Sequence, residues 1–190
     1  GTWFACRDRS VFRVARRDIL RLLFVGVVGL AFTNFTYYYT VSEASVAAAI
    51  LIQYTAPALV MVYMVLVARE ERGSPIKVGA LGLAMLGCYL AVKGEGASLA
   101  LPGWSLVSGP ATAICFAVMI VGSKQLLRIY SQWTVLTYLF GIAAAFWLCV
   151  HPPWAVLAEG YTAPDWGVFL VFSIVSVLVP YIFFAVSLRR

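Results

Sequence analysis

The sequence predicts an all-α integral membrane protein, a polytopic bundle of about six transmembrane helices. Hydrophobic residues make up 63% of the 190 residues and charged residues only 12%, against roughly 45–50% and 25% in soluble domains. If the apolar stretches cross a membrane in turn, 13 of the 14 Lys and Arg residues lie on the same side of that membrane. Only Lys93 lies on the other side. Because cationic segments near helix ends resist translocation, we expect the basic side to face the cytoplasm.

Six apolar stretches have the length of a membrane crossing, which takes about 20 apolar residues. In chain order we expect spans at residues 20–39, 46–68, 76–92, 104–121, 133–150 and 166–187. Ser42, Glu43 and Ser45 form a polar break between the first two spans. Interfacial aromatics support these ends, since Trp104, Trp133, Trp154 and Trp166 lie at or near them.

The net charge of +6 raises the question of a nucleic-acid partner. The basic residues lie in short segments between apolar stretches, which is typical of a membrane protein, so we expect no nucleic-acid partner. The stretch 7–21 carries six Arg and is interpreted as a cytoplasmic loop that can touch anionic lipid headgroups. The lipid bilayer is thus the first predicted partner.

A weak internal repeat joins the first and last predicted spans. Phe35, Tyr37 and Tyr38 match Tyr181, Phe183 and Phe184 at a constant offset of 146, and Asn34 and Pro180 precede the two sets. The two spans are five crossings apart, so they run in opposite directions. A five-helix unit repeated in inverted topology is common among secondary transporters.

The order of several motifs resembles the EamA-type proteins of the drug/metabolite transporter superfamily. The resemblance rests on the segment 37–48, on Tyr54-Thr55-Ala56-Pro57, on the loop Arg69-Glu70-Glu71-Arg72, and on Gly79, Gly82 and Gly87. It departs from the family where Arg69 replaces the loop Gly. We expect the three glycines of the third span to serve close helix packing, as we do Gly109 in the fourth.

The resemblance implies a ten-helix inverted-repeat transporter, of which this chain is a piece with helices three to eight. Residues 1–94 would then hold the rest of the first repeat, a cytoplasmic Arg-rich segment with three helices. Residues 95–190 would hold the first three helices of the second repeat. The implied function is alternating-access transport of small organic metabolites, amino acids or drugs across the cytoplasmic (inner) membrane. A small six-helix channel or membrane scaffold subunit is the alternative, and a homodimer stays open.

Candidate substrate-binding residues were sought at span depth. Gln53 needs hydrogen-bond partners there, and Pro57, one turn later, leaves a main-chain carbonyl near Gln53 without its usual donor. Asn34 and Tyr37 suit an aromatic or amphipathic solute, because the ring gives contact area and the polar atoms give direction. The matching face of the sixth span holds Ser176, Pro180 and Tyr181. For Gln53 and Ser176 the alternative is helix packing.

The sequence lacks the residue patterns of catalytic, metal-binding and cofactor-binding sites. We expect no enzyme, because neither a nucleophile with its base nor paired carboxylates lie at membrane depth. Cys6, Cys88, Cys115 and Cys149 are scattered and His151 is alone, so no metal and no cofactor are predicted. Since no carboxylate lies in mid-span, exchange or facilitated transport is favoured unless helices outside this chain carry the coupling group.

Overall fold

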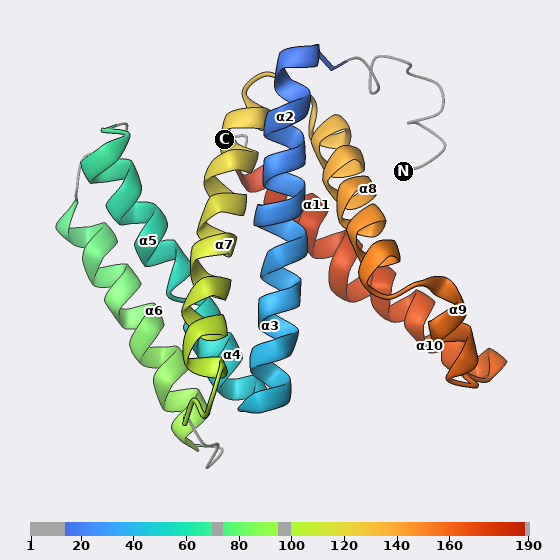
Figure 1. Ribbon diagram of the computed structural model, residues 1–190. Coiled ribbons are helices and arrows are strands. Elements are labelled where there is room, and N and C mark those ends of the chain that lie inside the picture. The colour runs from blue at the N-terminus through green and yellow to red at the C-terminus, as the bar shows by residue number, and fades with distance from the viewer. Residues whose placement is uncertain (1–13, 70–73, 95–99, 189–190) are drawn as a thin grey trace. The chain divides into compact units, whose positions relative to one another are not determined.

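The computed structural model describes residues 14–69, 74–94 and 100–188, and these residues form helices joined by short connections (Figure 1). The first helical segment runs through α2 (Arg16–Phe24), the π-helical turn η2 (Val25–Ala31) and α3 (Phe32–Glu43). The next contains α4 (Val46–Gln53), α5 (Ala56–Val62) and the π-helical turn η3 (Tyr63–Val67). They are followed by α6 (Pro75–Gly94) and α7 (Ser105–Leu127).

The remaining helices are α8 (Gln132–Val150), the short α9 (Pro153–Ala158), α10 (Ala163–Phe172), the π-helical turn η4 (Ser173–Leu178) and α11 (Val179–Leu188). The chain divides into two compact units. The first unit holds residues 1–27 and 122–190, and the second holds residues 28–121. The predicted boundary between residues 94 and 95 concerns sequence repeats rather than compactness, and it stays a prediction.

Five helical segments of the described residues are long and apolar enough to cross a membrane: Arg16–Glu43, Val46–Val67, Ser105–Leu127, Gln132–Val150 and Ala163–Phe184. They confirm the all-α polytopic membrane fold and five of the expected spans, with shifted ends. The expected third span is a helix, but its apolar stretch, Pro75–Leu90, is shorter than the other five.

The Arg-rich stretch was predicted to be a loop as far as Arg21, and this is wrong for its last six residues. The helix begins at Arg16, because residues 16–24 form an amphipathic segment in which Asp18 and Leu22 are buried. Residues 7–13 lie outside the described residues. The predicted polar break is confirmed: α3 ends at Glu43, and the Ser45 side chain caps α4 by accepting a hydrogen bond from the Ala48 N–H at 3.1 Å.

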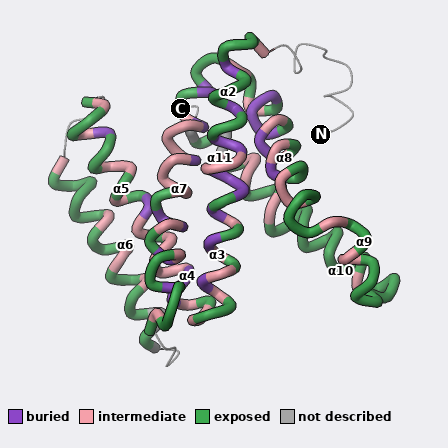
Figure 2. The backbone as a smooth tube through the Cα atoms, in the orientation of Figure 1, coloured by how far each residue is buried: buried purple, intermediate pink, exposed green. Residues whose placement is uncertain are grey.

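Burial is uneven along the chain. Figure 2 shows buried residues along α3, α7 and α8, whereas α10 is almost entirely exposed. The most apolar window of the span Ala163–Phe184 has none of its residues buried inside the protein, although its mean hydropathy is 2.4. Such a helix is stable only where lipid or another apolar surface covers it.

Candidate functional site

Four of the predicted site residues lie in the second unit, on α3, α4 and α5. Asn34 and Tyr37 are half-buried on α3, Gln53 is half-buried as the last residue of α4, and Pro57 is exposed in the first turn of α5. Within the described part of the chain, neither the Asn34 nor the Gln53 amide forms a hydrogen bond with another side chain. Each of these two neutral amides lies within a membrane span and can still donate and accept hydrogen bonds.

The α-helix of the second span is interrupted directly after Gln53 by a two-residue turn whose backbone angles stay in the helical region; we call this interrupted helix the broken span. Tyr54 and Thr55 form a turn in which the Thr55 N–H and hydroxyl both donate to the Ile52 carbonyl, at 2.9 and 2.6 Å. Pro57 follows at the start of α5 and brings no N–H of its own. The irregular turn lies where the sequence predicted that Pro57 leaves a main-chain carbonyl without its usual donor. In transporters, interrupted helices can supply main-chain polar groups to a buried cavity.

A cluster of hydroxyl groups joins α3 to α7 within the same unit. The Thr112 hydroxyl donates to the Thr36 hydroxyl at 2.9 Å, and the hydroxyls of Thr40 and Ser108 lie 2.7 Å apart. Thr36, Thr40 and Thr112 are buried, and Ser108 is half-buried. We call Thr36, Thr40, Ser108 and Thr112 the hydroxyl cluster; it is a set of interhelical hydrogen bonds of the kind that stabilises helix pairs in lipid.

Close backbone approach keeps the same two segments in register. A Cβ added to Gly29 would lie 3.0 Å from the Met119 Cα. In the residue pairs 29/119, 36/112 and 40/108 the two residue numbers always add up to the same value. One segment therefore runs antiparallel to the other with a constant register. A second approach occurs at Gly109, where an added Cβ would lie 2.9 Å from the Ile52 Cδ1. The packing role predicted for Gly109 is confirmed.

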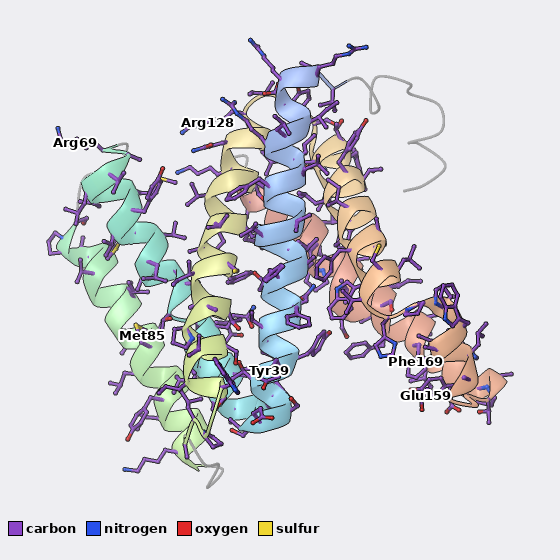
Figure 3. All side chains as sticks on the ribbon, in the orientation of Figure 1. Tyr39, Arg69, Met85, Arg128, Glu159 and Phe169 are labelled. Atoms are coloured by element: carbon purple, nitrogen blue, oxygen red, sulfur yellow. The ribbon has the colours of Figure 1, made fainter. Side chains whose placement is uncertain are left out.

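The packing role predicted for Gly79, Gly82 and Gly87 has no counterpart among the described residues and stays a prediction. A Cβ added to any of them would meet no atom within 4 Å. The half-buried residues of α6 recur at Leu81, Met85 and Cys88, so α6 contacts α4 through a different face. Met85, labelled in Figure 3, belongs to this face.

An apolar groove of about 480 Å³ lies between these helices. Ile52, Tyr54 and Thr55 line it from the broken span, and Met85, Leu86 and Tyr89 line it from α6. Gln53 is not among the lining residues. The groove therefore adjoins the broken span without using the predicted polar group.

The other three predicted site residues lie in the first unit. Ser176, in η4, and Pro180, in α11, are both exposed. Tyr181 is half-buried and packs edge-to-face on Phe140 of α8, with ring centroids 5.2 Å apart. The predicted residues therefore form two sets, one in each unit. Both sets lie beside an irregular helical segment. Ser176 lies in the π-helical turn η4, and Gln53 precedes the interrupted part of the second span. Such π-helical turns are frequent at functional sites.

Sequence reasoning missed a buried carboxylate at the start of α2. Asp18 is 2% exposed, and its Oδ2 accepts a hydrogen bond from the Tyr130 hydroxyl at 2.6 Å. Arg21 lies 3.5 Å from Oδ1. The Tyr130 hydroxyl also accepts the Ala15 N–H at 3.2 Å, so one phenol ties the turn after α7 to the start of α2.

The i,i+3 spacing of Asp18 and Arg21 was the available sequence signal, but Tyr130 is 112 residues away. The hydrogen bond to Asp18 is the main reason that the pKa of Tyr130 is raised, and the Ala15 N–H partly opposes it. The pair stabilises one end of the first unit.

No three His, Cys, Asp or Glu side chains of the described residues lie close enough together to hold a metal ion. Cys88, Cys115 and Cys149 are free thiols. The polar chemistry at span depth in the second unit thus consists of hydroxyls, amides and phenols.

These features define a class of protein before any comparison: a multi-pass helical membrane protein whose helices are joined at span depth by neutral hydrogen bonds. The sequence profile of the EamA-like transporter family matches residues 2–93, which are 92 of the 190 residues. Residues 2–93 are therefore similar to the EamA-like transporter family, and the predicted resemblance is confirmed.

One curated relative supports the same class. The chain is 27% identical over 121 residues to the "Uncharacterized inner membrane transporter YicL" of Salmonella typhimurium. The matched region covers 63% of this chain and 40% of the relative, so the chain spans less than half of the length of that protein. No solved structure matches the chain.

Proposed function

We propose that the protein transports small organic solutes, such as metabolites, amino acids or drugs, across the cytoplasmic membrane by alternating access. The observation that carries the proposal is the broken span inside the segment matched to the EamA-like transporter family. A transporter must expose a site to each side in turn, and a discontinuous helix can change its geometry more easily than a continuous one. The name of the relative, which calls it an inner membrane transporter, supports the proposed location in the cytoplasmic membrane.

In this proposal Gln53, Asn34 and Tyr37 contact the solute. The Gln53 amide offers both a donor and an acceptor next to the helix break, and Asn34 offers the same on α3. Tyr37 is half-buried and packs edge-to-face on Tyr38, with centroids 5.7 Å apart, so its ring is held in place. Pro57 contributes by keeping the helix broken rather than by contact.

Ser176, Pro180 and Tyr181 would be the corresponding set in the second repeat, which we take to begin at residue 95. The support for this is the offset of 146 between the two aromatic triplets and the π-helical turn beside Ser176. Each set is proposed to line a path in its own unit. Self-association as a homodimer is part of the same proposal.

Because the polar groups of the second unit at span depth are neutral, we propose exchange or facilitated diffusion rather than coupling to an ion through these residues. A charged coupling residue would need a partner or water at that depth.

The test is transport by the protein expressed from its complete reading frame and reconstituted in vesicles. The probes are a mixture of radiolabelled amino acids and, separately, the dye ethidium. For whichever probe is transported, Gln53→Ala and Tyr37→Phe should lower the rate, because each removes a polar group at the proposed contact. Leu59→Ala is the matched control, since Leu59 is 41% exposed on the same broken span. Equal rates for all three variants and the parent would remove the site assignment.

A further inference from the structure

The first unit contains an open apolar groove where two spans meet the short helix α9. Its volume is about 560 Å³. The lining residues that shape it are Ala144, Trp147 and Leu148 of α8, Val156 and Leu157 of α9, and Trp166 of α10. The groove thus lies at the end of α8 and the beginning of α10, which both belong to membrane-length apolar segments.

The walls of the groove are held by aromatic packing. Trp147 packs edge-to-face on Phe146, with centroids 5.9 Å apart. Trp166 contacts Tyr161 and Phe169 at 6.2 and 6.0 Å, and these two rings are 5.1 Å apart. Large aromatic side chains gather at membrane–water interfaces, where one end of the ring is apolar and the other is wet. Figure 3 labels Phe169 and Glu159 in this region.

Helix α9 has the composition of a segment that lies in such an interface. Its sequence is PWAVLA, with no charged residue in the helix. Trp154 and Leu157 are 74% and 67% exposed. Glu159 follows the helix and His151 precedes it, so polar groups flank both ends. An exposed apolar helix with polar flanks is stabilised by insertion between headgroups and acyl chains.

The chemistry of the lining selects the occupant. His151 is the one titratable residue among those that line the groove, and it lies at the junction of α8 and α9. An anionic or cationic solute would find no opposite fixed charge in the lining to offset its desolvation. A hydrocarbon chain needs no such partner, and the bilayer supplies acyl chains at this depth.

We propose that the groove formed by α8, α9 and α10 binds one acyl chain of a bilayer phospholipid, with α9 lying along the membrane–water interface. The bound chain covers apolar walls that the described protein leaves open. Because the lining offers shape and apolar contact rather than charge, binding is independent of headgroup charge and of salt concentration.

The test uses vesicles of phosphatidylcholine that contain a phosphatidylcholine with a photoactivatable diazirine in its acyl chain. The full chain is reconstituted and illuminated, and the cross-linked residues are mapped by mass spectrometry. Cross-links should be several times more frequent at Leu148 and Leu157 than at Leu170 and Val171. Those two α10 residues are the matched controls, because they are 62% and 60% exposed but do not line the groove.

Ala144→Trp and, in a separate protein, Leu148→Trp are designed to fill the groove. Each should abolish the cross-link at Leu157 and keep that at Val171, and replacing half of the lipid by phosphatidylglycerol should change neither. Uniform labelling of Leu157 and Val171 would overturn the proposal by showing ordinary boundary lipid. Labelling at Val171 alone would overturn it as well, because another protein surface would then occupy the groove.

Discussion

The two compact units use different chemistry for their long-range polar contacts. In the second unit, the hydroxyl cluster joins α3 to α7 through neutral groups, with oxygen–oxygen distances of 2.7 and 2.9 Å. In the first unit, the Asp18 carboxylate, in the first turn of α2, accepts a hydrogen bond from the Tyr130 hydroxyl, with an oxygen–oxygen distance of 2.6 Å. Neutral bonds thus lie inside the spans and the charged bond lies where a span begins.

The difference follows from the cost of burying charge. A carboxylate at span depth must find strong partners or become protonated, whereas a hydroxyl can satisfy itself on the carbonyl of the preceding turn. Thr40 does so with the Thr36 carbonyl at 2.8 Å. Asp18 is tolerated because Arg21 and Tyr130 surround it at a helix end. The solute proposed for the second unit should accordingly be recognised by neutral groups.

Removing the charged contact should have the largest effect on stability. Asp18→Ala should lower the free energy of unfolding by about 1.5–3 kcal/mol, the range for hydrogen bonds to charged groups. The measurement is unfolding of the micelle-solubilised protein with increasing denaturing detergent. Arg17→Ala is the control, because Arg17 is exposed and lies 4.0 Å from the carboxylate. An equal loss in both variants would contradict a special role for Asp18.

Forcing α3 and α7 apart should destabilise the second unit slightly less. Gly29→Leu should lower the free energy of unfolding by about 1–3 kcal/mol, as overpacking does, because the added Cβ would meet the Met119 backbone. Gly82→Leu is the matched control on α6, where an added Cβ meets no atom within 4 Å. The same detergent titration distinguishes them. Indistinguishable unfolding of the two variants would be evidence against the close approach.

The hydroxyl cluster should contribute a smaller coupling energy. In a double-mutant cycle, Thr36→Val and Thr112→Val should show an interaction of about 0.6 kcal/mol, a typical value for interhelical hydrogen bonds in membranes. The effect is small because each hydroxyl can fall back on a helix carbonyl: Thr36 on Phe32 and Thr112 on Ser108. Strict additivity of the two substitutions would show that the hydroxyls do not interact.

The smallest effect concerns alkaline pH. The raised pKa of Tyr130 means that folding favours the neutral phenol, chiefly through its bond to Asp18. Its contribution is therefore complete below the unfolded value of about 10 and is lost as pH rises through the folded value. Tyr130→Phe should remove this part of the alkaline decline when stability is followed from pH 8 to 12. A parent and a variant with parallel pH profiles would contradict the assignment.

The sequence was sufficient where local patterns decide the structure. Five of the six spans follow from apolar runs, and the break at Ser42–Ser45 follows from its polar residues. Contacts between distant segments were not accessible in this way. The Asp18–Tyr130 bond joins residues 112 apart, and the α6 glycines face outward because Met85 and its neighbours occupy the contact with α4. Helix α9 was not predicted, because its six residues fall between the expected spans 133–150 and 166–187.

The central claim is that Asn34, Tyr37 and Gln53 line a path open to water and solute. The most direct measurement replaces each of them singly by Cys in an otherwise cysteine-free protein and follows its reaction with a membrane-impermeant methanethiosulfonate reagent. Thr40→Cys and Leu66→Cys are controls, since Thr40 is fully buried and Leu66 is an apolar residue that is 67% exposed on a span. We predict reaction at all three positions and at neither control. If the three positions react no faster than Leu66→Cys, the proposed path is contradicted.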